Sequence, residues 1–239
     1  RAEESPGTSS ASKEEDEELA QLAAEMPDTL AAIHALKQYM PGIGEVPPVV
    51  LHHQLHSIVQ NRTQVEEELA SLRAQHKVRI ITLRSAVSDV GVVLTEDYIA
   101  RLRYERAKLG TSDAQQRALE AFEHWILHDD SVSVTEAKLM RPPASTSLPP
   151  LLEEEIKYLV SAGFLLPRRE IHEPGGYWLT LPEIGRLTTL IVAARKEITS
   201  RIKRTQRKEV LERNFTKAKL KSSPLGWEYH IRDAAGAGM

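Results

Sequence analysis

A similar set of secondary-structure signals, helices and a short strand followed by two β-type runs, occurs twice along the chain and constrains its fold more than any other feature. Within residues 28–95 the order is helix, short apolar strand, helix, helix and two β-type runs, at 78–83 and 91–95. The helices carry apolar residues every three or four positions, and the β-type runs are rich in valine and isoleucine. Within 96–181 a connecting helix, a helix capped at Ser112, a short strand, another helix and two β-type runs follow. The chain therefore contains two units of similar construction.

Helices followed by a two-stranded hairpin are typical of winged-helix domains. The sequence therefore predicts a mainly α fold with small β-hairpin wings, built from tandem winged-helix domains. We expect a disordered acidic tail over 1–27, a first winged helix over 28–108 and a second over 109–205. A third winged helix, partial and truncated at its C-terminal end, is predicted over 206–239, with a strand-like run at 227–231. Because the chain begins with arginine, we interpret it as a fragment.

Single residues are predicted as caps and core positions within these units. Thr63 and Glu66 have the spacing of a capping box, which predicts the start of the third helix of the first unit. Ile58 is placed on the inward face of the helix before it. Leu152 is placed on the inward face of the helix that follows the proline-rich loop 141–150.

Charge is distributed unevenly along the chain. The formal net charge is −3. Residues 1–27 hold eight acidic and two basic side chains, whereas residues 195–221 hold eleven lysines and arginines against three glutamates. Their local net charges are thus −6 and +8. This asymmetry indicates a polyanionic partner for the basic segment and a solvated acidic tail at the other end.

Several classes of protein are excluded by what the sequence lacks. It contains no cysteine, which removes disulfides, thiol catalysis and cysteine-based zinc sites. No apolar run approaches the roughly 18 residues of a membrane span. The phosphate loop, the catalytic aspartate loop and the metal-binding Asp-Phe-Gly of kinases are all missing, and there is no Walker-type P-loop. We therefore predict a protein that is not an enzyme and has no cofactor.

Three histidines, His52, His53 and His56, cluster on the second helix of the first unit. Their i and i+4 spacing is compatible with a metal ion. There is no His-Glu-x-x-His pattern and no acidic third ligand nearby in the sequence. Exposed histidines on a helix surface are therefore the preferred interpretation, and no metal site is predicted.

The basic segment carries the functional prediction. Lys196, Lys203 and Arg207 fall within roughly 20° of one direction around a helix, and apolar residues such as Ile198 run along the opposite side. Cations so close together repel one another, and the phosphates of double-stranded DNA are a natural neutralising partner. The predicted DNA-contacting residues lie in this segment and in the second wing: Arg195, Lys196, Lys203, Arg204, Arg207, Lys208, Lys217, Lys219, Lys221, Arg168 and Arg169.

Other interpretations of the basic segment stay open. It is also compatible with a merely solvated helix face, a nuclear import signal around 201–208, or contact with an acidic protein or a membrane surface. The helices at the usual recognition position begin with the acidic runs 66–68 and 153–155. These predict binding to the DNA backbone with weak sequence specificity. They also support a second hypothesis, a protein-interaction scaffold without nucleic acid.

Several segments resemble the family of serine/threonine-protein kinase 19. They are VPPVVL at 46–51, NRT at 61–63, TEDY at 95–98, VSAG at 160–163, GYWLTLP at 176–182 and WEYH at 227–230. The resemblance implies tandem winged helices that bind duplex DNA in the nucleus, despite the kinase name. It implies a role in transcription-coupled nucleotide excision repair, with the stalled RNA polymerase II repair complex and the helicase of the general transcription factor as partners. No membrane partner is expected, and a homodimer stays open.

The resemblance also implies positions for the DNA-contacting residues. One basic position of the family falls on Lys203, which keeps the charge, and another on Gln206, which does not, although Arg207 lies beside it. A later basic pair falls near Ala218 and Lys219, so half of it is kept. The exact contacts are therefore expected to differ from those of the family.

Overall fold

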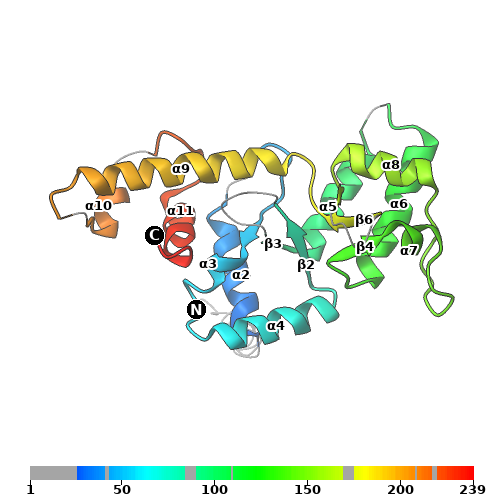
Figure 1. Ribbon diagram of the computed structural model, residues 1–239, viewed down its shortest axis with the longest axis horizontal. Coiled ribbons are helices and arrows are strands. Elements are labelled where there is room, and N and C mark those ends of the chain that lie inside the picture. The colour runs from blue at the N-terminus through cyan, green and yellow to red at the C-terminus, as the bar shows by residue number, and fades with distance from the viewer. Residues whose placement is uncertain are drawn as a thin grey trace, which may run out of the picture.

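The computed structural model shows three groups of elements (Figure 1). It describes residues 26–40, 43–83, 90–108, 110–168, 175–207, 209–216 and 220–239. The first group lies in the centre of the view and the second on the right. The long helix α9 (Ile184–Arg204) extends along the top to the left, above two shorter helices. The acidic tail predicted over 1–27 lies outside the described residues up to position 25.

The first group has the predicted order of elements. They are α2 (Asp28–Gln38), β1 (Val50–Leu51), α3 (His52–Leu55), α4 (Arg62–Ala74), β2 (Val78–Thr82) and β3 (Val90–Leu94). The three helices contribute Leu36, Leu55 and Leu72 to one apolar cluster, where each is almost completely buried. Burying a leucine side chain contributes about 1.5–3 kcal/mol, so this cluster holds the helices together.

The second group repeats the scheme with one additional helix. Its elements are α5 (Thr95–Arg106), α6 (Asp113–His128), β4 (Ser133–Thr135), α7 (Glu136–Met140), α8 (Glu153–Ala162), β5 (Leu165–Pro167) and β6 (Gly176–Leu179). The predicted cap at Ser112 is confirmed, because its Oγ accepts a hydrogen bond from the Gln115 amide at 3.3 Å. Gly163 closes α8 in the left-handed conformation, with φ of 86°.

Two antiparallel sheets of three strands have the same internal topology. Their strand orders are β1-β3-β2 and β4-β6-β5, so in both the last strand of the hairpin lies in the middle. In the first sheet Ile80 pairs with Val92, and in the second Leu166 pairs with Trp178. The predicted fold class, mainly α with small β-hairpin wings, is confirmed.

The C-terminal elements differ from the prediction. After α9 come α10 (Glu212–Thr216) and α11 (Trp227–Gly236). The strand predicted at 227–231 is wrong, because this segment is the start of a helix. Alternating Trp227, Tyr229 and Ile231 suggested a period of two, but the buried residues Trp227, His230 and Asp233 recur at helical spacing.

Three local predictions are also wrong. Helix α4 starts at Arg62 rather than after Thr63, because the Asn61 side chain accepts a hydrogen bond from the Gln64 amide. Ile58 is 39% exposed because α3 ends before it. Leu152 is 59% exposed because it precedes α8 instead of lying on its inner face.

The two groups share one core. The largest apolar cluster includes residues of both groups, among them Leu51 and Phe164. Thr180, which follows β6 of the second group, donates from Oγ1 to the carbonyl of Thr82 in β2 of the first group at 3.0 Å. Its own carbonyl accepts from the buried Tyr98 hydroxyl of α5 at 2.9 Å. The two groups are therefore packed against each other, and the boundaries 28–108, 109–205 and 206–239 stay a prediction.

Among the helices of the described residues, we find none with the length and apolar composition that crossing a bilayer requires.

Candidate nucleic-acid interface

Helix α9 has two faces because its apolar residues are spaced four, three and four positions apart. Leu187, Ile191, Ala194 and Ile198 are buried along one side. Ala194 and Ile198 pack with Trp227 of α11 in a small separate cluster. Burial of this row fixes the rotation of α9 about its own axis, so its opposite side faces solvent.

The exposed side of α9 presents a row of cations. Lys196 and Lys203 are seven residues apart, which places them within about 20° of one direction and about 10 Å apart along the helix. Thr199 and Ser200 lie between them and add two hydroxyl groups. A shallow hollow of about 500 Å³ is lined by Arg195, Lys196, Thr199, Ser200, Lys203 and Arg204. We call these six residues the α9 groove.

Three cations of the α9 groove are available to a partner. Lys196, Lys203 and Arg204 are exposed, and none forms an ion pair with a carboxylate of the described residues. Arg207 is exposed too, but α9 ends at Arg204 and Thr205 has an extended conformation. The prediction that Arg207 continues the same helical row is therefore wrong, and Arg207 lies beyond the helix end.

Two neighbouring arginines bind other side chains of the same protein. Arg201 donates to Glu197 at 2.6 Å, and its guanidinium stacks 4.9 Å from the centre of the Trp227 ring. Arg195 donates from two nitrogens to the carboxylate of Asp233, at 2.8 and 2.6 Å. Only 14% of the Arg195 side chain is exposed. These arginines position α9 and α11, while the charges that face solvent lie on their neighbours.

Glu197 ties the segment after α10 to the same helix. One of its oxygens accepts hydrogen bonds from the backbone amides of Lys221 and Ser222, at 3.2 and 3.0 Å. Burial raises the pKa of Glu197, but hydrogen bonds from Ser222 and Arg201 outweigh this effect and lower it overall. The anchored backbone places the exposed Lys221 beside α9.

The other predicted contact residues lie in the second wing or outside the described residues. Arg168 donates to the Ser133 hydroxyl at 3.1 Å and stacks 4.5 Å from the centre of the Trp178 ring. Arg169, Lys208, Lys217 and Lys219 lie outside the described residues, so their positions stay predictions.

The helices at the recognition position expose carboxylates. Glu66 and Glu67 are exposed on α4, as are Glu153 and Glu154 on α8. Glu155 is different: it is buried, pairs with an arginine of α6 and accepts a hydrogen bond from the backbone at the start of α8. Both helices therefore present negative charge where a typical helix-turn-helix approaches DNA.

Sequence reasoning missed two features of this region. Thr199 and Ser200 lie within about 60° of Lys196 and Lys203 around the helix, one on either side, so a helical projection would have found them. The interpretation that no acidic ligand lies near the histidines is wrong, because Glu66 of α4 lies 2.8 Å from Nε2 of His52. That contact joins residues 14 positions apart in the sequence, so local spacing could not reveal it.

Two helix-containing units, each with a three-stranded antiparallel sheet in the same strand order, define a tandem winged-helix protein. The family described as inactive serine-threonine protein kinase 19 matches residues 20–239 of this chain. Because the match covers most of the chain, this protein belongs to that family.

Curated relatives support the same assignment. "Winged helix repair factor 1" of Xenopus laevis is 31% identical over 198 residues, which cover 81% of this chain and 70% of the relative. The protein of the same name from Homo sapiens is 29% identical over 227 residues, covering 90% and 82%. "Serine/threonine-protein kinase mug51" of Schizosaccharomyces pombe is 28% identical over 208 residues, covering 82% and 63%. The kinase name recurs in this family, whereas the sequence here has no kinase motif.

Proposed function

We propose that this protein is a non-catalytic, nuclear adaptor that binds double-stranded DNA during repair. The α9 groove holds the phosphate backbone, and Arg207 and Lys221 extend the contact beyond the helix end. The observation that carries the proposal is the row of exposed cations Lys196, Lys203 and Arg204 on α9, none of which pairs with a carboxylate in the part of the chain that the structure describes.

The groove is long enough to reach more than one phosphate of a duplex. Phosphates of one strand rise about 3.4 Å each along the duplex axis and also turn around it, so Lys196 and Lys203, roughly 10 Å apart along α9, are placed to contact two separate phosphates. The hydroxyls of Thr199 and Ser200 lie between the cations and are suited to donate to phosphate oxygens. Each neutralised phosphate releases bound counterions, which favours association at low salt.

The acidic recognition helices define how the protein docks. Pushing α4 or α8 into the major groove would bring Glu67 or Glu153 toward phosphates. We infer that neither helix reads bases and that α9 contacts the backbone instead, with little sequence preference.

The names of the relatives support a role in repair. Relatives called winged helix repair factor cover most of this chain. We propose that the chain acts in transcription-coupled nucleotide excision repair, together with the stalled RNA polymerase II repair complex and the helicase of the general transcription factor. We also propose that two copies of this protein form a homodimer.

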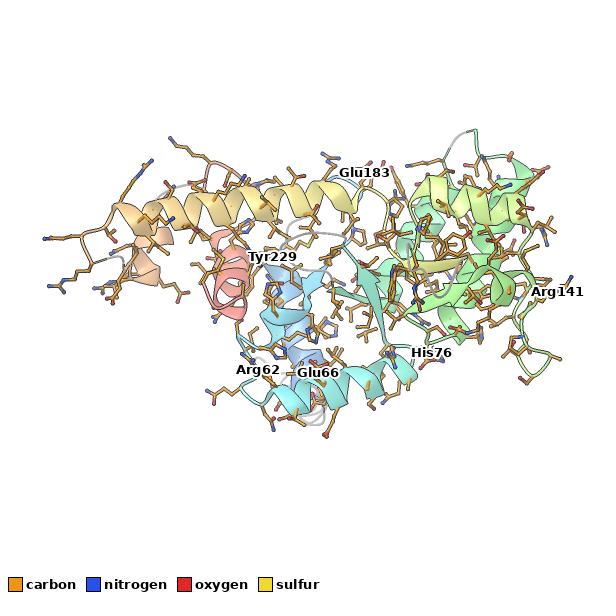
Figure 2. All side chains as sticks on the ribbon, in the orientation of Figure 1. Arg62, Glu66, His76, Arg141, Glu183 and Tyr229 are labelled. Carbon is orange, nitrogen blue, oxygen red and sulfur yellow. The ribbon has the colours of Figure 1, made fainter. Side chains whose placement is uncertain are left out.

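Charge reversal on α9 tests DNA binding. The variant Lys196→Glu/Lys203→Glu is compared with Lys77→Glu/Arg141→Glu, which changes the net charge equally at two exposed cations that form no ion pair within the described residues. Arg141 lies at the far end of the molecule from α10 (Figure 2). Fluorescence anisotropy with a labelled duplex should show at least about a tenfold loss of affinity for the first variant and less than about threefold for the second. Equal losses would contradict the proposed site.

A second candidate function is a protein-interaction scaffold without intrinsic DNA binding. The exposed carboxylates of α4 and α8 favour it, because they form two acidic surfaces suited to basic protein partners. Pull-down from nuclear extract after nuclease treatment distinguishes the two candidates. Partners that are retained by a protein with no measurable affinity for duplex DNA would favour the scaffold.

A further inference from the structure

Two histidine rings and one carboxylate converge between α3 and α4. His52 and His56 are four residues apart, so they lie on the same side of α3 and the turn that follows it. Nε2 of His52 lies 2.8 Å, and Nε2 of His56 3.8 Å, from the same oxygen of Glu66. The two rings meet edge to face, with their centres 5.1 Å apart. Figure 2 shows Glu66 on α4, one turn after Arg62.

We propose that His52, His56 and Glu66 bind a divalent transition-metal ion, with zinc as the best match. Two imidazole nitrogens and one carboxylate oxygen are ligands that zinc takes in proteins. The three ligand atoms lie within 4.8 Å of one another. This site is separate from the α9 groove and does not depend on the proposed DNA binding.

To hold the ion, the distances between ligand atoms must change by about 0.5 to 1.5 Å, because these atoms lie up to 4.8 Å apart. Zinc lies about 2.0–2.2 Å from nitrogen and oxygen ligands, so tetrahedral ligand atoms are roughly 3.3 Å apart. The contact between His52 and Glu66 must open by about half an ångström, and that between His56 and Glu66 must close by as much. The Glu66 side chain is 58% exposed and is free to rotate, whereas the His56 side chain is held at 14% exposure.

The fourth coordination position faces solvent. A hollow of about 300 Å³ beside the cluster is lined by His52 and Glu66 together with residues of β2 and β3. Three protein ligands and one position open to water are a known form of zinc coordination. Because the ligands come from α3 and α4, the bound ion would join the two helices that precede the first wing.

A second histidine pair in the same chain serves as a control for nonspecific binding of metal ions by histidine side chains. His124 and His128 of α6 are also four residues apart, exposed and in ring contact, with their centres 5.8 Å apart. No carboxylate completes a three-residue cluster around them among the described residues. Two histidines without a third ligand bind metal ions weakly. This pair therefore shows how much zinc affinity the i, i+4 spacing of two histidines provides by itself.

The experiment uses the full chain without a histidine tag, titrated with zinc chloride by isothermal titration calorimetry. The wild type should bind one zinc ion tightly and unfold at a higher temperature with zinc than with a chelator. The variants Glu66→Gln and His52→Ala/His56→Ala should each lower the affinity by at least about tenfold, because each removes ligands. The variant His124→Ala/His128→Ala should leave the affinity and stoichiometry unchanged.

Two results would overturn the site. One is a wild type that shows no saturable binding at one ion per chain. The other is a Glu66→Gln variant that keeps wild-type affinity, or a His124→Ala/His128→Ala variant that loses as much as His52→Ala/His56→Ala. Because Glu66 is exposed and Gln keeps its shape, the Glu66→Gln variant should fold, which circular dichroism checks directly.

Discussion

Asp233 joins three helices through a single buried carboxylate. Its side chain is completely buried on α11, yet both oxygens have partners. Arg195 of α9 donates to both, and His53 of α3 lies 2.7 Å from one of them. Burial raises the pKa of Asp233, but the hydrogen bonds from Arg195 and His53 outweigh it, so the pKa lies below its usual value. The position of α9 therefore depends on an ion pair far from its exposed face.

Removing this carboxylate should be costly. Asp233→Asn keeps the shape of the side chain but leaves the Arg195 guanidinium buried without a counter-charge, so we expect a loss of about 3–5 kcal/mol in unfolding free energy. Glu153→Gln breaks a solvent-exposed pair with Lys157 and should change the unfolding free energy far less, because water screens this pair. Urea denaturation measures both, and similar values for the two variants would contradict this account.

His230 should make stability depend on pH. Its side chain is completely buried, and neither ring nitrogen has a hydrogen-bond partner in the structure. Burial lowers its pKa from 6.5 to about 4. In the unfolded chain the imidazole binds a proton below pH 6.5, whereas in the folded protein it does so only near pH 4. The folded state therefore has its full stability with respect to His230 above pH 6.5, and it loses this contribution as the pH falls to about 4.

The variant His230→Phe isolates this contribution. It fills a similar volume without a titrating group, so its unfolding free energy should change less between pH 7 and pH 4.5. The wild type should lose about 2 kcal/mol more over that interval. Chemical denaturation at a series of pH values checks this, and parallel curves for the two proteins would exclude His230 as the cause. Asp233 does not interfere, because its lowered pKa places its titration below this interval.

Secondary-structure elements could be predicted where apolar spacing was regular. The row Leu119, Phe122 and Ile126 of α6 is buried as expected, and the β2–β3 hairpin pairs as predicted. Helix α11 could not be predicted, because Trp227 and Tyr229 are two positions apart, a spacing typical of one face of a β-strand. What decides its conformation is tertiary: Tyr229 donates to the Val49 carbonyl, 180 positions away.

The candidate site was predictable in part for the same reason. The exposure of Lys196 and Lys203 follows from their spacing opposite a buried row. In contrast, spacing does not predict that Arg195 and Arg201 point away from solvent, because this depends on their contacts with Asp233 and Trp227 of α11. Local periodicity places a residue on a face of a helix, but it does not reveal a partner that is distant in the sequence.

The C-terminal end of α8 contains a position that only glycine suits. Gly163 has φ of 86°, and a Cβ added there would lie 3.2 Å from Cα of Pro182. Gly163→Ala should therefore lower the unfolding free energy by more than about 1 kcal/mol. Gly185 lies in the first turn of α9 with open space around it, so Gly185→Ala should instead stabilise by about 0.4–1 kcal/mol. Thermal unfolding measures both, and a stabilising Gly163→Ala would contradict the observed backbone.

Two kinds of charged residue lie in different places on the molecule: those that form internal ion pairs and those that face solvent. Internal pairs such as Arg195–Asp233 and Arg201–Glu197 attach α9 to the rest of the protein. Lys196, Lys203 and Arg204 are exposed on α9. The C-terminal part of α9 lies away from the acidic helices α4 and α8 (Figure 1). We expect this arrangement to attract a polyanion to one face and to keep it away from the helices that usually read bases.

The salt dependence of DNA affinity tests the proposed contact most directly. Wild type and Lys196→Gln/Lys203→Gln are titrated with a labelled duplex over a series of salt concentrations, and the logarithm of the association constant is plotted against that of salt concentration. The glutamine variant should bind more weakly at low salt, with a slope shallower by about 2, because two phosphate contacts no longer release counterions. Identical slopes and affinities for two folded proteins would show that these lysines do not contact DNA.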